Sequence, residues 1–381
     1  TGTGKTKTLQ VFVEQLSHKG IPSLVMDIKG DLSGIAVEGE QNDKINERYA
    51  KTKLPYQPQS FPVELMTISS EKGLKLRATV TEFGPVLLSK ILGLNDTQAS
   101  IMSIVFKYSD DKGLPLIDLD DLKKVLQYVT DNAEGKKDLA NNYGAISPAS
   151  LGAILRSIVA LEQQGATGFF GEPSFDVVDL LQTRGGKGVV NVLRVADIQN
   201  QPQLFSMFML SLFAEIYMTF PEEGDSGKPK LVLFIDEAHL IFNEASKTLL
   251  SQIETMVKLI RSKGVGIYFI TQIPGDVPEN VLSQLGLKIQ HALRGFTAKD
   301  RKEIDKAVEN YPITEYYDAG NLIQNLGIGE AFITALDEKG IPTPLVHTYL
   351  ISPESRMDVL TNDEIDDLVN ASDLAANTIK K

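Results

Sequence analysis

The chain opens with the stretch Thr1-Gly2-Thr3-Gly4-Lys5-Thr6, which decides how the rest of the sequence is interpreted. It matches the second half of the phosphate-binding pattern G-x-x-x-x-G-K-S/T, the Walker A loop. Gly2 and Gly4 allow a tight turn whose backbone N–H groups point at phosphate oxygens, because neither residue has a Cβ to block the approach. The pattern predicts that Lys5 reaches the terminal phosphates and that the Thr6 hydroxyl is a ligand of Mg²⁺.

The residues after this loop predict a helix. Leu9, Phe12 and Leu16 have the spacing of one helix face, so the positive end of the helix would point at the same phosphates. The residues expected to bind the nucleotide are Thr1, Gly2, Thr3, Gly4, Lys5, Thr6 and Lys7. A complete motif would have a strand and G-x-x before Thr1. The alternative interpretation is a short Gly/Thr turn that happens to precede Lys-Thr.

A second motif lies far along the chain, where the apolar run Leu231–Ile235 leads directly into Asp236 and Glu237. A strand buried on both faces delivers such acids to the carboxyl edge of a parallel sheet. We expect Asp236 to bind Mg²⁺ together with Thr6, and Glu237 to activate the attacking water. An apolar run before Asp-Glu is common in buried strands, so this Walker B pattern carries weight because it accompanies Lys5 and Thr6. The presence of Glu237 beside Asp236 favours hydrolysis of the nucleotide over nucleotide binding alone.

Two further predicted strands end in polar residues, which we expect at the same carboxyl edge of the sheet. Val265–Ile270 predicts a strand closed by Gln272, which we expect to lie between the terminal phosphate and the water. The alternative for Gln272 is an ordinary strand-end amide. Ser23–Ile28 predicts an earlier buried strand, and around its end Asp27, Lys29 and Asp31 face the ligand crevice or cap a turn.

The order of elements predicts an α/β fold with a central, mostly parallel sheet and an all-α insertion. We expect four segments: the first part of the P-loop core at 1–82, the helical insertion at 83–165, the rest of the core at 166–351 and an acidic helical tail at 352–381. The third segment includes two final strands, expected at Glu330–Leu336 and Thr343–Ile351.

The composition restricts the classes of function. The absence of Cys excludes a disulfide framework and a thiolate metal site, and only four His argue against a histidine metal centre. No run of about 18 uninterrupted apolar residues occurs, so we expect no membrane span. The absence of Cys supports a cytoplasmic location. The net charge of −12 argues against a generic basic coat for nucleic acid. A basic loop such as Thr183-Arg184-Gly185-Gly186-Lys187 could still contact nucleic acid, although it is also compatible with a plain turn.

Taken together, these motifs resemble those of the HerA/FtsK clade of P-loop ATPases, most closely the HerA-helicase-like C-terminal (YjgR-like) family. The segments that carry the resemblance span residues 1 to about 355. They are Thr1–Thr6, Met26–Leu32, Phe234–Leu240, Arg261–Gly266 with Thr271-Gln272, and His291–Arg294 with Phe296-Thr297.

The resemblance implies a RecA-like sheet, Mg²⁺-dependent hydrolysis of ATP to ADP and, as in better-known members, a hexameric ring that moves DNA. It also implies that Arg261 or Arg294 stabilises the γ-phosphate charge, in its own subunit or from a neighbour. Either arginine is alternatively an ordinary surface or salt-bridge residue. The large helical insertion sets the sequence apart from the HerA translocases.

Three functions remain open at this point. The first is an oligomeric, ATP-driven motor that acts on DNA, which the resemblance favours. The second is an ATPase that uses its nucleotide cycle as a switch for a protein partner, without nucleic acid. The third is a nucleotide-binding protein with vestigial hydrolysis. The acidic net charge favours the second.

Overall fold

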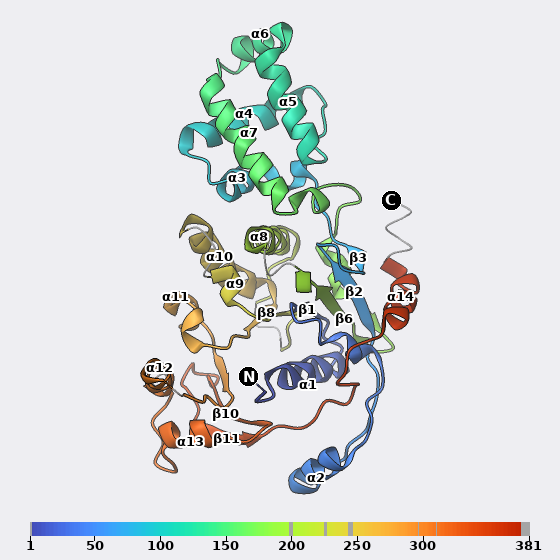
Figure 1. Ribbon diagram of the computed structural model, residues 1–381, viewed down its shortest axis with the longest axis vertical. Helices are drawn as coiled ribbons and strands as arrows, with labels where there is room; N and C mark the ends of the chain where they lie inside the picture. Colours follow the sequence, from blue (N-terminus) through green and yellow to red (C-terminus); the bar gives the residue numbers. More distant parts are fainter. Residues whose placement is uncertain are drawn as a thin grey trace.

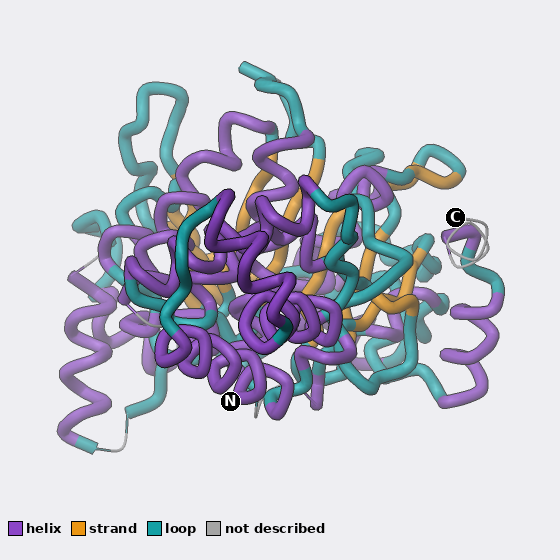
Figure 2. The backbone as a smooth tube through the Cα atoms, turned by 90° about the horizontal axis from the view of Figure 1, so that it is seen from above, coloured by secondary structure: helices purple, strands orange, loops and turns teal. Residues whose placement is uncertain are grey.

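The computed structural model describes residues 2–197, 201–224, 227–242, 247–295, 297–309 and 311–374. At its centre is a six-stranded parallel sheet with the strand order β3-β2-β6-β1-β7-β8. Figure 2 shows these strands running between layers of helices. The strands are β1 (Ser23–Asp27), β2 (Val63–Thr67), β3 (Leu74–Lys75), β6 (Val190–Arg194), β7 (Leu231–Ile235) and β8 (Val265–Phe269).

Helices lie on both faces of this sheet (Figure 1). The bounds of the described α-helices, including those away from the sheet, are α1 (Lys5–His18), α2 (Asp43–Thr52), α3 (Val80–Ile91), α4 (Asp96–Asp111), α5 (Leu119–Asp131), α6 (Ala133–Asn142), α7 (Pro148–Gln163), α8 (Pro202–Thr219), α9 (His239–Phe242), α10 (Lys247–Ile260), α11 (Glu279–Leu282), α12 (Ala298–Glu309), α13 (Ala319–Asn325) and α14 (Asn362–Asn370). Among the described residues, none of these helices has the length and apolar character needed to cross a membrane.

The central strands are apolar because both of their faces are buried. In β1, Leu24 and Met26 join the core on the α8 and α10 side, whereas Val25 joins the core under α1 and α14. In β7, Leu233 and Phe234 divide between the same two cores. Full burial of each such side chain contributes about 1.5 to 3 kcal/mol, so the parallel register of β1 and β7 is strongly favoured.

Five consecutive helices, α3 to α7, occupy the upper part of Figure 1. The first begins with a capping box in which Thr79 and Glu82 bond each other's backbone N–H groups. Their apolar faces continue the core of the sheet, as the buried side chains of Leu122 and Ile154 show. The division of the chain into segments that we infer from the sequence stays a prediction.

The last strands form a second sheet rather than extending the first. They are β9 (Leu287–Gln290), β10 (Glu330–Ala335) and β11 (Val346–Tyr349), in the antiparallel order β11-β10-β9. The two final strands predicted from the sequence belong to this sheet. Its apolar side chains pack into a cluster of their own with α12 and α13, which includes Phe332, Ile304 and Ile323.

Arg48 of α2 connects to this second sheet. Its guanidinium donates hydrogen bonds to the carbonyls of Ile328, Gly329 and Leu350 at 2.7 to 3.1 Å. Gly329 has φ of +74°, and a Cβ there would lie 2.4 Å from the Arg48 guanidinium. Another residue at this position would have a strained backbone and would displace the Arg48 guanidinium.

The basic loop singled out in the sequence is a hairpin of β4 (Thr183–Arg184) and β5 (Lys187–Gly188). Arg184 forms an ion pair with Glu64. Lys187 donates to the side-chain oxygen of Gln59 at 2.7 Å and lies over the Phe61 ring. Both cations thus contact their own chain, which favours the interpretation as a turn.

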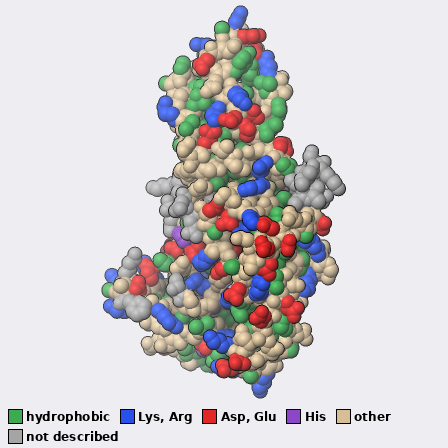
Figure 3. Space-filling view, turned by 45° about the vertical axis from the view of Figure 1, so that its right-hand side comes forward, with side chains coloured by type: hydrophobic (Ala, Val, Ile, Leu, Met, Phe, Trp, Pro, Cys, Tyr) green, Lys and Arg blue, Asp and Glu red, His purple; other side chains and the backbone are tan. Residues whose placement is uncertain are grey.

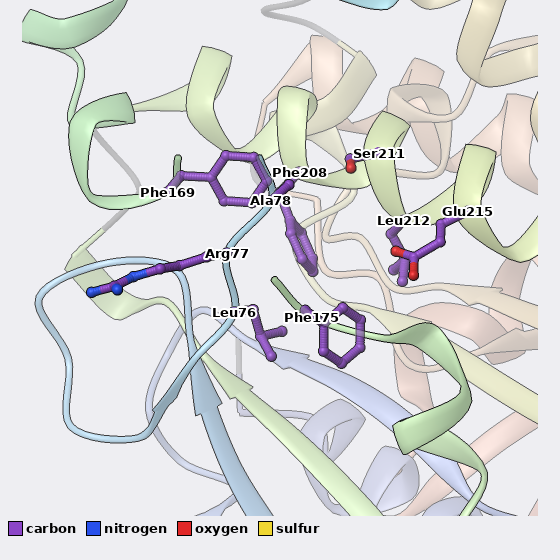
Figure 4. A pocket seen from close by; sticks show the side chains of 9 residues that line it. All are labelled: Leu76, Arg77, Ala78, Phe169, Phe175, Phe208, Ser211, Leu212 and Glu215. Carbon is purple, nitrogen blue, oxygen red and sulfur yellow. The ribbon is translucent and has the colours of Figure 1, made fainter. Parts of the chain in front are cut away.

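A small cavity of about 10 Å³ lies between α8 and the segment Leu76–Ala78 (Figure 4). Its lining is largely aromatic and aliphatic, with Glu215 as the acidic member. The Glu215 carboxylate accepts the N–H of Val177 at 3.0 Å. Burial raises the pKa of Glu215 to about 7, against 4.5 for an unburied glutamate.

This carboxyl group predicts a pH dependence of stability. The folded protein keeps the Glu215 proton up to about pH 7, whereas the unfolded chain releases it near 4.5, so stability falls as pH rises between the two values. Glu215→Gln keeps an oxygen acceptor for Val177 and removes the charge. We expect the variant to be more stable than the wild type at about pH 8, by up to about 3 kcal/mol, and similar at about pH 4.

Urea denaturation at the two pH values measures the difference in unfolding free energy. Glu338→Gln, in an exposed turn, is the control and should show no such change with pH. A constant difference between wild type and Glu215→Gln across this range would contradict the assignment.

Candidate functional site

The glycine-rich stretch forms the turn that leads into α1. Gly4 is the N-cap residue with φ of +104°, a left-handed conformation that strains other residues. Its carbonyl accepts the N–H of Thr8 at 2.9 Å, so the helix begins at Lys5. Gly4 offers no side-chain acceptor, which leaves the first N–H groups of α1 open to an anion. Thr1 lies outside the described residues.

The carboxyl ends of three neighbouring strands bring the other site residues together. Asp236 and Glu237 directly follow β7, Lys29 follows β1, and Gln272 follows β8. Because β1, β7 and β8 are adjacent and parallel, their ends lie at one edge of the sheet.

Glu237 is the centre of a group of polar contacts at this edge. Its Oε1 lies 2.8 Å from the Lys29 ammonium and accepts a hydrogen bond from the Gln272 amide at 2.9 Å. Its Oε2 lies 3.2 Å from Nδ1 of His239. The Lys29 ammonium is also 3.4 Å from Oδ2 of Asp236. The structure therefore brings Gln272 to Glu237, and it adds Lys29 to the pair of acids.

These contacts determine the charge of the acids. Burial raises the pKa of Asp236, and the nearby Lys29 offsets only part of this effect. Burial acts on Glu237 in the same direction, but hydrogen bonds from Lys29 and Gln272 hold the pKa of Glu237 below its ordinary value. Glu237 has φ of +49°, and such a conformation costs a non-glycine residue about 1 to 3 kcal/mol. Glu237 is thus an ionised carboxylate in a strained position.

Lys5 lies within electrostatic reach of the same group. Burial and the charge of Lys29 lower the pKa of Lys5, while Glu237 and Asp236 raise it. The half-buried Thr6 follows it in the chain. Thr6 and Asp236 are oxygen donors, which suits Mg²⁺, an ion that binds few protein ligands and keeps phosphate oxygens and waters. The described residues hold no cluster of three or more His, Cys, Asp or Glu suited to a metal.

Buried polar atoms near the loop also fit a ligand. His291 is 5% exposed and its Nε2 lies 2.9 Å from the Thr8 hydroxyl. Within the described part of the chain, the buried Thr3 hydroxyl has no hydrogen-bond partner. An unsatisfied buried polar atom costs about 1 to 3 kcal/mol. The loop and its surroundings therefore have the character of an anion site.

The second sheet also contacts the loop. The N–H of Gly329 donates to the carbonyl of Thr3 at 3.3 Å, and a Cβ on Gly4 would lie 3.4 Å from the same nitrogen. With His291 at Thr8, the β9 to β11 sheet thus forms one wall of the phosphate loop.

Three predicted site residues are not brought into this group. Arg261 is exposed and precedes β8, so it lies at the opposite edge of the sheet from Gln272. Arg294 is exposed, three residues after His291. The Lys7 ammonium contacts the carbonyl of Met357. Phe296, part of the resemblance, lies outside the described residues. The roles of these residues stay predictions.

Asp27 shapes the loop that carries Lys29. Its two carboxylate oxygens accept the N–H groups of Asp31 and Leu32, each at 3.1 Å. Burial raises the pKa of Asp27 to about 6, although the hydrogen bond from Leu32 opposes this. The sequence left Asp27 either facing the ligand crevice or capping a turn, and these contacts are those of a capped turn.

Sequence reasoning left two residues of this region without a role in the site. Lys29 was placed at the crevice by its strand, but its pairing with Glu237 depends on which strand lies beside β1. His291 follows β9 in the second sheet, 283 residues away from Thr8 in the chain, and no local pattern indicates that they meet.

The sheet is parallel, a phosphate loop precedes α1, and an Asp-Glu pair follows the central strand β7. These features define a P-loop NTPase with a RecA-like fold. The sequence pattern of the family described as "Helicase HerA-like C-terminal" matches residues 1–380. The chain belongs to this family. The resemblance expected from its motifs is thereby confirmed.

Solved structures share the same fold at low sequence identity. The bacterial conjugative coupling protein TrwB, in its unbound monoclinic form, has a TM-score of 0.58 at 14% identity, covering 95% of this chain and 86% of that one. VirB4 of Thermoanaerobacter pseudethanolicus has a TM-score of 0.53 at 14% identity, covering 92% and 86%. The predicted fold class is confirmed. Comparison with curated proteins gives no match.

The Asp27 contacts predict a measurable contribution to stability. Asp27→Ala leaves the buried N–H of Leu32 without an acceptor, so we expect a loss of about 1 to 3 kcal/mol in unfolding free energy. Asp31→Ala removes a neighbouring carboxylate and keeps both backbone hydrogen bonds, so it should cost less. Urea denaturation of both variants tests this; an equal loss would show that Asp27 does not organise the loop.

Proposed function

We propose that this chain is a Mg²⁺-dependent ATPase of the HerA/FtsK type. The observation that carries the proposal is the convergence of Lys5, at the start of α1, with Asp236, Glu237 and Gln272 at the sheet edge. Family membership supports it. Solved structures of TrwB in complex with ADP and Mg²⁺, and with a non-hydrolysable ATP analogue, share the fold at 14% identity.

In this proposal, Lys5 and the N–H groups of the loop bind the β- and γ-phosphates. Thr6 and Asp236 hold Mg²⁺, which when bound supplies positive charge to the phosphate oxygens. Glu237 takes a proton from water as the water oxygen attacks the γ-phosphorus. The bond to the β–γ bridging oxygen breaks, and its electron pair leaves with ADP. Gln272 holds Glu237 and the water in position.

Either predicted arginine could complete this site. The exposed position of Arg294 near the wall of the loop suits a contact in the same or a neighbouring subunit. Arg261 lies at the opposite edge of the sheet, so it could act only on the site of a neighbour. We therefore propose that the active form is an oligomer, with a hexamer implied by the resemblance.

We further propose that hydrolysis drives translocation or remodelling of DNA, as family membership favours. One set of observations favours instead a nucleotide switch that acts on a protein partner. The net charge is −12, and the cations of the 183–188 hairpin contact their own chain. On the face drawn in Figure 3, Lys and Arg side chains are interspersed with Asp and Glu. If the protein is instead a DNA motor, this mixed surface confines its DNA contacts to a few loops.

Two variants test the nucleotide chemistry. Lys5→Ala removes the cation that binds the phosphates, so its affinity for a fluorescent ATP analogue should fall by about 10-fold or more. Glu237→Gln keeps the shape of the side chain and removes the base, so binding should persist while turnover falls by about 100-fold or more. Melting temperatures establish that both variants fold. Unchanged affinity in the first, or wild-type turnover in the second, would refute the corresponding role.

The ATPase rate with and without DNA tests the coupled function. A motor should be stimulated by single- or double-stranded DNA at low salt, and the stimulation should disappear as salt rises, because phosphate contacts release counterions. Glu237→Gln with DNA is the control for contaminating ATPases. A flat response, with a monomeric mass by light scattering, would exclude the motor and favour the protein-partner switch.

A further inference from the structure

Lys29 lies in the candidate site, but the proposed ATPase mechanism gives it no role. Its ammonium lies 2.8 Å from Glu237 and 3.4 Å from Asp236. Side-chain exposure is 36% for Lys29, against 5% for Asp236 and 8% for Glu237. One half-exposed cation therefore contacts two buried carboxylates and offsets part of their charge.

The backbone enforces this position. β1 and β7 pair in parallel register with Met26 opposite Ile235, so the residues that follow the two strands leave the sheet side by side. The Asp27 carboxylate then fastens the loop through the N–H groups of Asp31 and Leu32. The Lys29 side chain starts from a defined point beside the acids.

The charges around Lys29 favour its ionised form. Burial lowers the pKa of Lys29, but its hydrogen bond to Glu237 and the charges of both acids raise the pKa above its ordinary value. Like charges buried together are unfavourable unless a cation lies between them. The Lys29 ammonium thus lies beside Asp236, the residue expected to bind Mg²⁺.

We propose that Lys29 is a second phosphate-binding lysine of this site, which pairs with Asp236 and Glu237 in the nucleotide-free protein and turns to the terminal phosphate when Mg²⁺ and ATP bind. This inference rests on the proposed ATPase function. It names Lys29 as the residue that distinguishes a triphosphate from a diphosphate.

The charges of the two lysines favour such a movement. Lys5 and Lys29 interact electrostatically with the same two carboxylates, and burial together with the charge of Lys29 lowers the pKa of Lys5. An anion between them relieves this repulsion. Asp236, as the expected ligand of Mg²⁺, no longer needs the Lys29 ammonium in the loaded site. The long, flexible stem of lysine allows the charge to shift while the backbone stays in place.

The movement also changes the contacts of the expected base. Oε1 of Glu237 receives both the Lys29 ammonium and the Gln272 amide. When Lys29 turns to the γ-phosphate, Oε1 keeps only the Gln272 amide of these two donors. ADP has no γ-phosphate, so it does not draw Lys29 away from Glu237.

Nucleotide binding by Lys29→Met tests the proposal. Displacement of a fluorescent nucleotide gives dissociation constants for ADP and for a non-hydrolysable ATP analogue, both with Mg²⁺. We expect the affinity for the ATP analogue to fall by about 10-fold or more and the affinity for ADP to change less than about 3-fold. Lys19→Met, an exposed lysine at the end of α1, is the matched control and should change neither.

Metal binding gives an independent readout. Without nucleotide, Lys29→Met leaves the two carboxylates without their cation, so the variant should bind Mn²⁺, a spectroscopic substitute for Mg²⁺, more tightly than wild type. Lys29→Gln keeps a hydrogen-bond donor to Glu237 and serves as the second variant if the methionine variant does not fold. Lys29→Arg keeps the charge and should restore part of the preference for ATP.

The outcomes separate this inference from the function on which it rests. If the wild type binds neither nucleotide, the proposed ATPase function fails. If the wild type binds both and Lys29→Met weakens both equally, or weakens neither, then Lys29 is a structural ion-pair residue and the inference is overturned. Unchanged Mn²⁺ affinity in the variant would likewise overturn the place of Lys29 between the carboxylates.

Discussion

Two carboxylates, Asp236 and Glu237, are buried next to each other at the end of β7, and much of the site serves to make this arrangement stable. Burial raises the free energy of a charged carboxylate, and a second one beside it adds repulsion. The protein offsets both effects with the Lys29 ammonium and the Gln272 amide, each brought by a neighbouring strand. The parallel register of β1, β7 and β8 is therefore a requirement of the chemistry as well as of the core.

The phosphate loop depends on a different part of the chain. His291 contacts Thr8, and Gly329 donates to Thr3, so the antiparallel second sheet closes against the turn before α1. Arg48 in turn holds the segment around Gly329 through three carbonyls. A change in the packing of this small sheet would be transmitted directly to the residues expected to bind phosphate. The site thus connects two structural units with separate hydrophobic cores.

The proposed ATP hydrolysis and the process coupled to it depend on different features of the protein. The group around Glu237 consists of short contacts between buried side chains, which support an ATPase irrespective of partner. The coupled partner depends on the surface, where the acidic net charge and the internal pairing of Arg184 oppose the family's association with DNA helicases. The helices α3 to α7 extend the core of the sheet and enlarge the surface available to a partner.

The sequence alone determined the residues whose roles follow from short-range spacing. Lys5 and Thr6 are adjacent in a glycine-rich turn, and Asp236 and Glu237 end an apolar strand, so local patterns suffice to propose a P-loop ATPase and its fold class. Gln272 was predictable because a polar strand end after the Walker B strand has one expected location, at the same sheet edge.

Only the tertiary structure decided which distant residues complete the site. Lys29 meets Glu237 because β1 lies beside β7, and His291 meets Thr8 because the final strands form their own sheet against the loop. The same structure separates Arg261 from the other site residues, since it precedes β8 rather than following it. Strand order and sheet membership arise from packing between segments hundreds of residues apart, and no local pattern of side chains encodes them.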